Sequence, residues 1–317
     1  MRNLILAVGL ACTPVLASPT FIVLQDLPYT DTQEYVYKNI VRPAIVSADA
    51  DFVIHGGDMQ GSKAVCSYAG LKALRDDLYS LKPERVFLTP GDNDWTDCDR
   101  PSNAKPVSEY QALGWLRELF YEPAPKGLPE WQLARQDAFP ENARWLVDNS
   151  LFVTLHILGT VNGRQQVYLD DPSYALEQVE ARDKANHLWL QEALTVAKAH
   201  NVTHMVVAAH ADITQLEGKP PCSRSRTSDC DPYQAYRKQL RDVAAEFGRP
   251  MLFIHGDTEP FCLDKNYGRK TATNLWRLNG AGDYNLIDAL RINIGDKDTE
   301  PFSIKALTRD IAPPLCK

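Results

Sequence analysis

The sequence predicts an α/β fold in which two mixed β-sheets pack against each other and helices flank them. Short apolar segments alternate with amphipathic helical segments over much of the chain, and the last part contains strand-like segments alone. Polar side chains that can bind a metal ion also follow several of the predicted strands directly. In folds of this kind, the functional site lies at the carboxyl ends of the strands.

The first part of the chain alternates strands and helices. Its predicted strands are apolar runs that end at a polar or glycine-rich turn: 20–24, 51–54 and 85–88. A capping box of Thr30 and Gln33 opens the first helix, whose expected apolar face comprises Val36, Ile40, Val41 and Ile45. The same apolar period predicts further helices at 65–81 and 108–120.

The segment 121–149 is rich in proline and aromatic residues, and we expect it to be an insertion over one face of the domain. Strands are predicted beyond it at 151–158, 203–208 and 251–254, with helices between them at 180–199 and 232–248. The last part of the chain is predicted to contain strands without helices between them, at 274–278, 286–293 and 302–307.

Length and composition favour one globular domain over residues 18–317. The chain has 317 residues, of which 44% are hydrophobic and 24% charged, so it can bury enough surface to offset the entropy of ordering. Its formal charge of -7, with no lysine or arginine cluster, argues against a nucleic-acid reader. An acidic protein that binds phosphate needs a local cation, and a metal ion is the strongest one available.

Residues 1–17 have the features of a cleaved signal peptide. Arg2 precedes an apolar run over 4–12, and the segment ends in the small residue Ala17. The alternatives are a buried first strand or an anchor, but a helix that spans a membrane needs about 20 apolar residues. We therefore expect an exported protein, periplasmic or secreted, with no membrane span after the signal is removed.

Of the seven cysteines, only Cys12 lies in the predicted signal peptide, and the even number that remains predicts disulfides in an exported chain. Spacing does not determine the connectivity. We expect bonds between Cys222 and Cys230, Cys66 and Cys98, and Cys262 and Cys316. The alternative, a zinc knot, would require paired Cys-x-x-Cys spacing, which is absent.

Metal-competent side chains follow successive predicted strands. They are Asp26, Asp58, Asn93, His210, and the pair Asp257 and Glu259. A single polar residue after a strand means little, because loops are polar. If all of these side chains converge at one edge, they would build a mixed oxygen and nitrogen site suited to Mn, Fe or Zn.

This order of motifs resembles that of the calcineurin-like metallophosphoesterases, which include the purple acid phosphatases, over residues 20–262. In that family an aspartate follows the first strand, and a Gly-Asp motif supplies a bridging carboxylate. A Gly-Asn-His-Asp/Glu motif, a lone histidine and a Gly-His-x-His motif complete the site. The resemblance implies a four-layer α/β/β/α sandwich. It also implies one ion at Asp26, a second ion at Asn93 and His210, and a bridge at Asp58. Asp257 and Glu259 then stand at the two histidine positions of the Gly-His-x-His motif.

Several motifs depart from the family pattern. Pro28 stands where the first motif has a histidine, and Tyr29 is the nearest polar replacement. Asp94 stands where we expect the histidine beside the scissile phosphate, and both closing histidines are carboxylates, with His255 upstream as a substitute or supporting partner. Asp94 and His255 are thus the expected catalytic residues. A site this rich in oxygen favours Mn or Mg over Zn, and a single ion held tightly.

The expected function is that of a metal-dependent hydrolase of phosphate mono- or diesters, acting on a small phosphorylated substrate through a metal-bound hydroxide. One or two divalent or trivalent ions (Mn, Fe, Mg or Zn) would be its cofactors. The alternative is a non-catalytic phosphate- or ligand-binding protein on a degenerate scaffold. The sequence lacks a Gly-x-Ser-x-Gly elbow, a P-loop and a dinucleotide fingerprint, so serine hydrolase, kinase and NAD-dependent functions have no support.

Overall fold

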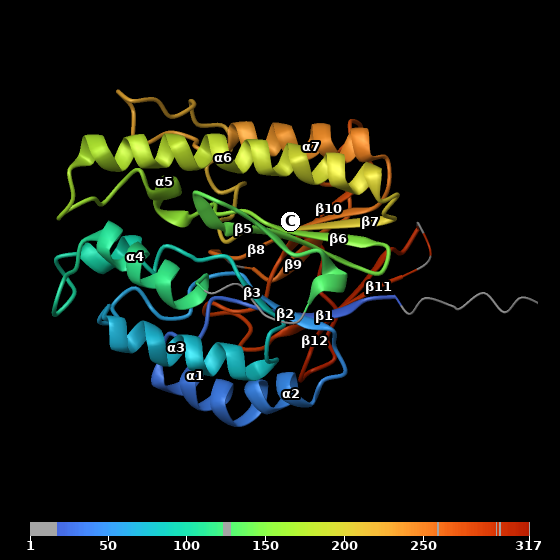
Figure 1. The fold of residues 1–317 in the computed structure, drawn as a ribbon, viewed down its shortest axis with the longest axis horizontal. Coiled ribbons are helices and arrows are strands. Elements are labelled where there is room, and N and C mark those ends of the chain that lie inside the picture. The colour runs from blue at the N-terminus through green and yellow to red at the C-terminus, as the bar shows by residue number, and fades with distance from the viewer. Residues whose placement is uncertain (1–17, 123–127, 259, 296, 298, 317) are drawn as a thin grey trace, which may run out of the picture.

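A computed structural model describes residues 18–122, 128–258, 260–295, 297 and 299–316 of the chain. The predicted signal peptide at 1–17 and the candidate ligand Glu259 lie outside the described residues. The described chain forms two β-sheets that pack against each other, with helices on both outer surfaces (Figure 1). The predicted α/β/β/α sandwich is therefore confirmed.

The smaller sheet has five strands in the order β12-β11-β1-β2-β3. At its centre, β1 (Thr20–Leu24) is parallel to β2 (Phe52–His55), which is parallel to β3 (Val86–Leu88). Antiparallel pairing adds β11 (Leu290–Ile294) next to β1 and then β12 (Phe302–Ala306). The carboxyl ends of β1, β2 and β3 therefore reach the same edge of the sheet.

The larger sheet has seven strands in the order β4-β5-β6-β7-β8-β10-β9. Its parallel strands are β6 (Ser150–Thr154), β7 (His204–Ala208), β8 (Met251–His255) and β10 (Leu275–Asn279). Antiparallel strands complete its edges: β9 (Cys262–Asp264), β4 (Ala134–Gln136) and β5 (Phe139–Val147).

Residues 134–147 are thus two strands of the larger sheet, whereas the sequence suggested an insertion over one face. The physical reason is Trp145 on β5, which is completely buried between the two sheets. Its ring stacks on that of Phe87 with a centroid distance of 3.7 Å and on that of Phe152 at 5.6 Å. Trp145 therefore belongs to the main core.

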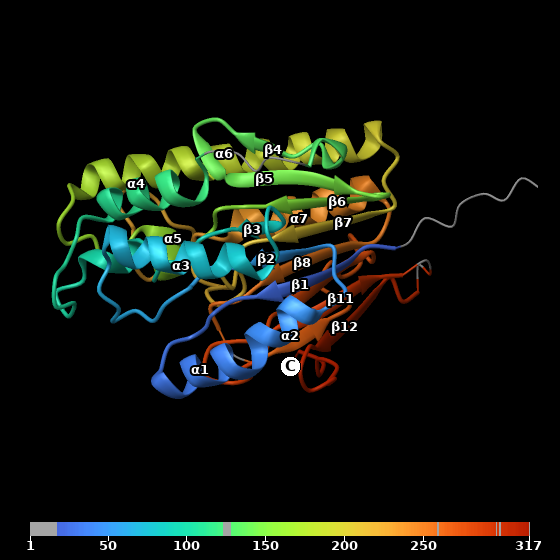
Figure 2. The same ribbon diagram turned by 60° about the horizontal axis from the view of Figure 1, so that its bottom comes forward.

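Helices cover both outer surfaces of the sandwich, as Figures 1 and 2 show. The larger sheet is covered by α6 (Pro172–Ala199) and α7 (Gln234–Phe247). The smaller sheet is covered by α1 (Asp31–Val36), α2 (Arg42–Ser47), α3 (Tyr68–Leu81) and α4 (Glu109–Phe120). A further short turn, α5 (Gly159–Gly163), follows β6.

The first helix departs from the expected apolar face at one position. A π-helical turn, η1 (Tyr37–Val41), joins α1 to α2. Val41 and Ile45 are buried as predicted, but Ile40 is 49% exposed. A π-turn contains more residues than an α-turn, so it rotates the residues that follow its start and directs Ile40 to solvent.

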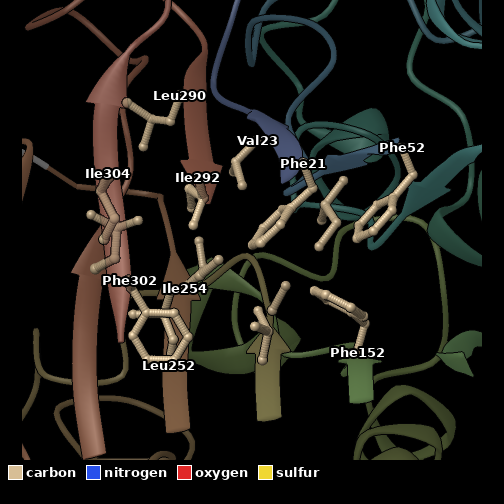
Figure 3. Packing of buried hydrophobic residues seen from close by; sticks show 14 of the residues in the cluster. Phe21, Val23, Phe52, Phe152, Leu252, Ile254, Leu290, Ile292, Phe302 and Ile304 are labelled. Atoms are coloured by element: carbon tan, nitrogen blue, oxygen red, sulfur yellow. The ribbon is translucent and has the colours of Figure 1, made fainter. Parts of the chain in front are cut away.

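The main core lies between the two sheets. Alternate residues of β1, Phe21 and Val23, point into it, because successive side chains of a strand face opposite sides of the sheet. Figure 3 shows Phe21 and Phe52 opposite Phe152 of the larger sheet. The ring centroids of Phe52 and Phe152 lie 4.7 Å apart with an edge-to-face arrangement, which is a favourable geometry for aromatic pairs.

Three disulfides join Cys66 to Cys98, Cys222 to Cys230, and Cys262 to Cys316, so the predicted pairing is confirmed. The first bond ties the segment after β2 to the 3-10 helix η2 (Thr96–Asp99), which follows β3. No helix in the described part of the chain is both long and apolar enough to cross a membrane.

Candidate metal centre

The candidate metal centre lies where the parallel strands of the two sheets end. Asp26, Asp58 and Asp257 each stand two or three residues after a strand, and their backbones are left-handed, with φ of 53°, 55° and 66°. Residues other than glycine seldom adopt this conformation, because the side chain crowds the backbone. Strained turns therefore direct these three carboxylates toward one another.

His210, which follows β7, is completely buried at the centre of these carboxylates. Its Nε2 lies 3.1 Å from Asp92 Oδ1, 3.5 Å from Asp58 Oδ1 and 3.7 Å from Asp257 Oδ1, and its Nδ1 lies 3.9 Å from Asp26 Oδ1. Two groups of side chains are close enough to hold an ion: Asp26, Asp58 and His210, and Asp92, His210 and Asp257. The structure thus brings together Asp26, Asp58, His210 and Asp257.

A backbone contact determines which ring nitrogen of His210 can bind a metal. His210 Nδ1 lies 3.0 Å from the carbonyl oxygen of Gly56. A carbonyl oxygen can only accept, so Nδ1 carries the hydrogen and donates it. In the neutral ring, Nε2 then has a free lone pair directed at the carboxylates, as in metal-binding histidines whose other nitrogen is held by a backbone oxygen.

Tyr29, which follows Pro28 in the loop after β1, contacts two carboxylates of the centre. Its hydroxyl lies 2.9 Å from Asp58 Oδ2 and 3.2 Å from Asp26 Oδ1, and it can donate to either carboxylate. The adjacent Gln25 donates from Nε2 to Asp26 Oδ2 at 3.1 Å. These contacts hold Asp26 and Asp58 side by side, so Tyr29 is the polar replacement that the sequence suggested.

Two glycines allow the loops of the centre to approach one another. A Cβ atom on Gly91 would lie 2.0 Å from Asp58 Oδ1, and one on Gly256 would lie 2.0 Å from Asp26 Oδ2. Both distances are far below van der Waals contact. Any other residue at these positions would therefore displace a carboxylate of the centre.

Asp92 belongs to the centre, although the sequence analysis assigned the ligand role to its neighbour Asn93. Besides its contact with His210, Asp92 accepts a hydrogen bond at Oδ2 from Thr160 Oγ1 at 2.5 Å. Counted from Gly91, Asp92 takes the asparagine place of the Gly-Asn-His-Asp/Glu motif, and Asn93 takes the histidine place. The expected register was therefore displaced by one residue. The spacing from Gly91 is the signal that would have found Asp92.

Asp94 occupies a structural position instead of the expected place beside a scissile phosphate. It is completely buried, and its carboxylate accepts from the backbone N–H groups of Asp58 at 2.9 Å, Met59 at 2.8 Å and Gly91 at 2.8 Å. Asp94 also does not line the pocket over the centre. Its role is to hold the loop that carries Asp58 against the loop that carries Asp92.

His255, the other expected catalytic residue, has both ring nitrogens in use. Nδ1 donates to the carbonyl oxygen of Gly256 at 3.0 Å, and Nε2 accepts from Arg277 Nη1 at 3.1 Å. Burial lowers the pKa of His255 to about 4, so the ring is neutral. Its carbonyl oxygen accepts from Gln25, which also contacts Asp26. His255 therefore supports the centre indirectly, through the hydrogen bond that its carbonyl oxygen accepts from Gln25.

The carboxylates at the centre lie so close together that a bound cation would stabilise them. Burial raises the pKa of Asp26 to about 6 and raises the pKa of Asp58 and Asp257 well above the usual value, and neighbouring carboxylates add to the effect. Burial alone would lower the pKa of His210, but Asp58 and the other carboxylates outweigh it and raise that pKa well above normal. This donor set, carboxylate oxygens with one imidazole nitrogen, fits Mn, Mg or Fe.

A pocket of about 210 Å³ opens over the centre. Asn93 and Tyr284 line it together with the carboxylates, and Arg100 is the one cationic side chain among its lining residues. Arg100 Nη1 lies 2.5 Å from Asp97 Oδ2. The one cationic side chain of this pocket is thus paired with one of its own carboxyl groups.

No protein-family model matches this chain, and no curated protein matches it in sequence. Among solved structures, it is similar to GAP50, the anchor in the inner membrane complex of Plasmodium. The TM-score is 0.51 and the identity 14%, over 95% of this chain and 90% of that chain. A weaker likeness, with a TM-score of 0.44 and 8% identity over 91% of this chain and 49% of the other, is to the NAD nucleotidase NadN of Haemophilus influenzae.

The chain shares its overall two-sheet α/β fold with GAP50. The likeness to GAP50 shows this fold alone, and the likeness to NadN is too weak to carry an argument.

Proposed function

We propose that this protein is an exported, metal-dependent phosphoesterase that hydrolyses a mono- or diester of a small phosphorylated substrate. The observation that carries the proposal is the arrangement of Asp58, Asp92 and Asp257 around His210 Nε2, at distances of 3.1 to 3.7 Å. All three carboxylates also line the pocket that would receive a substrate. The order of the sequence motifs, which resembles that of the metallophosphoesterases, supports the same assignment.

One ion would be held by Asp58, Asp92, His210 and Asp257. We expect a single tightly bound ion because the centre has one available imidazole nitrogen, and one nitrogen binds one metal ion. Asp26 and Asp58 border a second position, where Pro28 replaces an imidazole and binding would be weaker. When bound, the ion would act as a Lewis acid that polarises a phosphoryl oxygen and makes water nucleophilic near neutral pH. The donor set favours Mn or Mg, with Fe and Zn as alternatives.

The other pocket residues would position the phosphate group. Arg100, which is paired with Asp97 in the structure, would orient phosphate oxygens through its remaining N–H groups. The amide of Asn93 can donate a hydrogen bond, but it has no titratable proton to give to a leaving group. We therefore expect esters with good leaving groups, such as aryl phosphates, to be hydrolysed faster than alkyl phosphates.

The test is hydrolysis of p-nitrophenyl phosphate and its bis ester by protein loaded with Mn²⁺. We expect Asp58→Asn and His210→Ala each to reduce kcat/KM by at least about 100-fold, since even residues behind metal ligands contribute up to this factor. Asp229→Asn, the same chemical change at a side chain that is 82% exposed, is the matched control. Activity that survives both substitutions would rule out this centre.

The second candidate function is that of a non-catalytic phosphate-binding protein on the same scaffold. The observation that favours it is the loss of imidazoles, with Pro28 and Asn93 at places where the family has histidines. Elemental analysis and equilibrium dialysis with phosphate separate the two functions. Protein that binds Mn²⁺ and phosphate but leaves both nitrophenyl esters intact would establish the binding function.

Export is the remaining part of the proposal. Three disulfides support it, because such bonds persist in oxidising compartments. If residues 1–17 are a cleaved signal, protein purified from the periplasm or medium should begin at Ser18 by N-terminal sequencing. Recovery of the chain in the cytosol with its N-terminus intact would contradict export.

A further inference from the structure

A second cavity, of about 160 Å³, lies between α4, the N-terminal part of α6 and the start of β5. It shares no lining residue with the pocket over the metal centre, so it is a separate site. Its walls combine aromatic and cationic side chains: Trp95, Tyr110, Phe139, Tyr174, Arg117 and Arg182. The residues that line it include no carboxylate.

Arg182 on α6 is only 3% exposed, yet it forms no ion pair with any residue that the structure describes. Its Nη2 donates to the carbonyl oxygen of Asn162 at 2.7 Å, and its Nε has no partner among the described groups. The guanidinium lies 5.7 Å from the centre of the Trp95 ring. A buried charge without a counter-charge is costly, so an anion in the cavity would supply the missing partner.

The neighbouring titratable groups do not supply this negative charge. Glu141 is already paired with Arg117, whose Nε lies 2.5 Å from Glu141 Oε1. Burial raises the pKa of Glu109 to about 9, so this carboxyl near Arg182 is protonated at neutral pH. Burial also lowers the pKa of His156 to about 4, which leaves its ring neutral. The cavity wall is therefore positive.

Two further buried groups on the cavity wall lack a hydrogen-bond partner. Trp95 Nε1 has none among the described residues, and neither ring nitrogen of His156 has one, the nearest carboxylate oxygen being Glu141 Oε2 at 3.7 Å from Nδ1. Buried donors are nearly always satisfied in native proteins. The indole N–H of Trp95 and the single N–H of the neutral His156 ring are donors, so they point to a ligand that accepts hydrogen bonds.

The aromatic walls indicate what kind of anion fits. Tyr110 packs edge-to-face on Tyr174 with ring centroids 4.9 Å apart, and on Trp95 at 5.9 Å. A cavity of about 150 Å³ is known to accept a benzene ring. We propose that this cavity binds a small aromatic carboxylate, with its carboxylate at Arg182 and its ring against Trp95, Tyr110 and Tyr174. The proposal concerns binding and does not depend on the function of the metal centre.

Gly114 on α4 provides a way to close the cavity without removing any polar group. It is an exposed residue of the cavity lining, and a Cβ atom added to it would meet no heavy atom within 4 Å. Replacing a helical glycine also favours the helix itself. Gly114→Leu should therefore fold normally and place its side chain at the entrance.

The test is isothermal titration of the full-length protein with benzoate, acetate and benzyl alcohol. We expect saturable binding of benzoate, with acetate and benzyl alcohol at least about tenfold weaker because each lacks one of the two recognised groups. Arg182→Met and Gly114→Leu should each weaken benzoate binding at least about tenfold. Arg144→Met, which removes a guanidinium 4.1 Å from the ring of Trp189 and outside the cavity, should leave it unchanged.

Three outcomes would overturn the proposal. The first is the absence of saturable benzoate binding by the folded protein up to about 10 mM. The second is equal binding by Arg182→Met, or by Gly114→Leu if Arg182→Met does not fold by circular dichroism. The third is acetate binding as tight as that of benzoate, which would show that the aromatic walls recognise nothing.

Discussion

The core between the sheets and the metal centre are built from the same strands, but they differ in every physical respect. Phe21 of β1 and Phe52 of β2 are regular strand residues, completely buried among other apolar side chains. A few residues further along the same segments, the backbones of Asp26 and Asp58 are left-handed and their acidic side chains are crowded against each other. Burial stabilises the first region, whereas it raises the electrostatic cost of the second.

The core therefore stabilises the folded protein, whereas the metal centre without its ion destabilises it. A folded domain is stable by only about 5–15 kcal/mol, so strained backbones and crowded carboxylates must be offset elsewhere. The aromatic core next to the centre provides this support. We expect substitutions in the two regions to change stability in opposite directions, and three experiments test that difference.

The largest effect should come from Phe52→Ala in the core. The ring of Phe52 is completely buried and packs on Phe21 at 5.3 Å and Phe152 at 4.7 Å. Its removal should reduce the free energy of unfolding by about 3–5 kcal/mol, measured by denaturant titration. Tyr35→Ala, at a side chain that is 67% exposed, should change it by less than about 0.5 kcal/mol. Similar effects of the two substitutions would contradict the role of this core.

Asp58→Asn should have the opposite sign in metal-free protein. The amide retains an oxygen to accept from the N–H of Asn93, which contacts Asp58 Oδ1 at 3.1 Å, but it removes one charge from the cluster. We expect the variant to be more stable in EDTA by about 1 kcal/mol, as is common for substitutions at functional sites. Wild-type protein should gain thermal stability with Mn²⁺, and the variant should gain less.

Asp229→Asn is again the matched control, and its thermal stability should equal that of the wild type both in EDTA and with Mn²⁺. If Asp58→Asn lowers the melting temperature in EDTA and Mn²⁺ stabilises it as much as the wild type, the centre is neither strained by its charges nor completed by a cation.

Glu109→Gln extends the comparison to a buried carboxyl outside the centre. Burial raises the pKa of Glu109 from 4.5 to about 9. Because the folded state holds this proton more tightly than the unfolded chain, the stabilising contribution is complete below pH 4.5 and is lost as the pH rises toward 9.

We therefore expect Glu109→Gln to match the wild type near about pH 4 and to exceed its stability by at least about 1 kcal/mol near pH 8. Denaturant midpoints at several pH values measure this difference, with the exposed Glu177→Gln as control. A stability difference that does not change with pH would mean that Glu109 is not held protonated in the folded protein.

Much of the local structure follows from local sequence patterns. The apolar run at 20–24 coincides with β1, and the hydroxyl of Thr30 accepts from the backbone N–H of Gln33 as the capping pattern predicts. These features depend on neighbouring residues alone, so periodicity and capping chemistry are sufficient to find them. The same patterns placed Asp26, Asp58, His210 and Asp257 at strand ends.

The predictions from sequence were wrong where contacts between residues far apart in the chain decide the structure. Residues 134–147 became strands because Trp145 fills space between the sheets, which no local pattern indicates. Asp94 was expected at the substrate, but its buried carboxylate accepts from two backbone N–H groups of the loop after β2 and from one of its own loop. Asp92, which was not among the predicted ligands, contacts His210 and belongs to a group of side chains that could hold an ion.

The sequence by itself determined most of the strands and helices and placed Asp26, Asp58, His210 and Asp257 at strand ends, because these features depend on residues close together along the chain. Only the tertiary structure decided which carboxylates surround His210 and which are held by backbone N–H groups. It also decided that Arg182 is buried without a counter-charge. These outcomes depend on left-handed turns and on the packing of two sheets, which bring together atoms more than a hundred residues apart, as for Asp92 and His210.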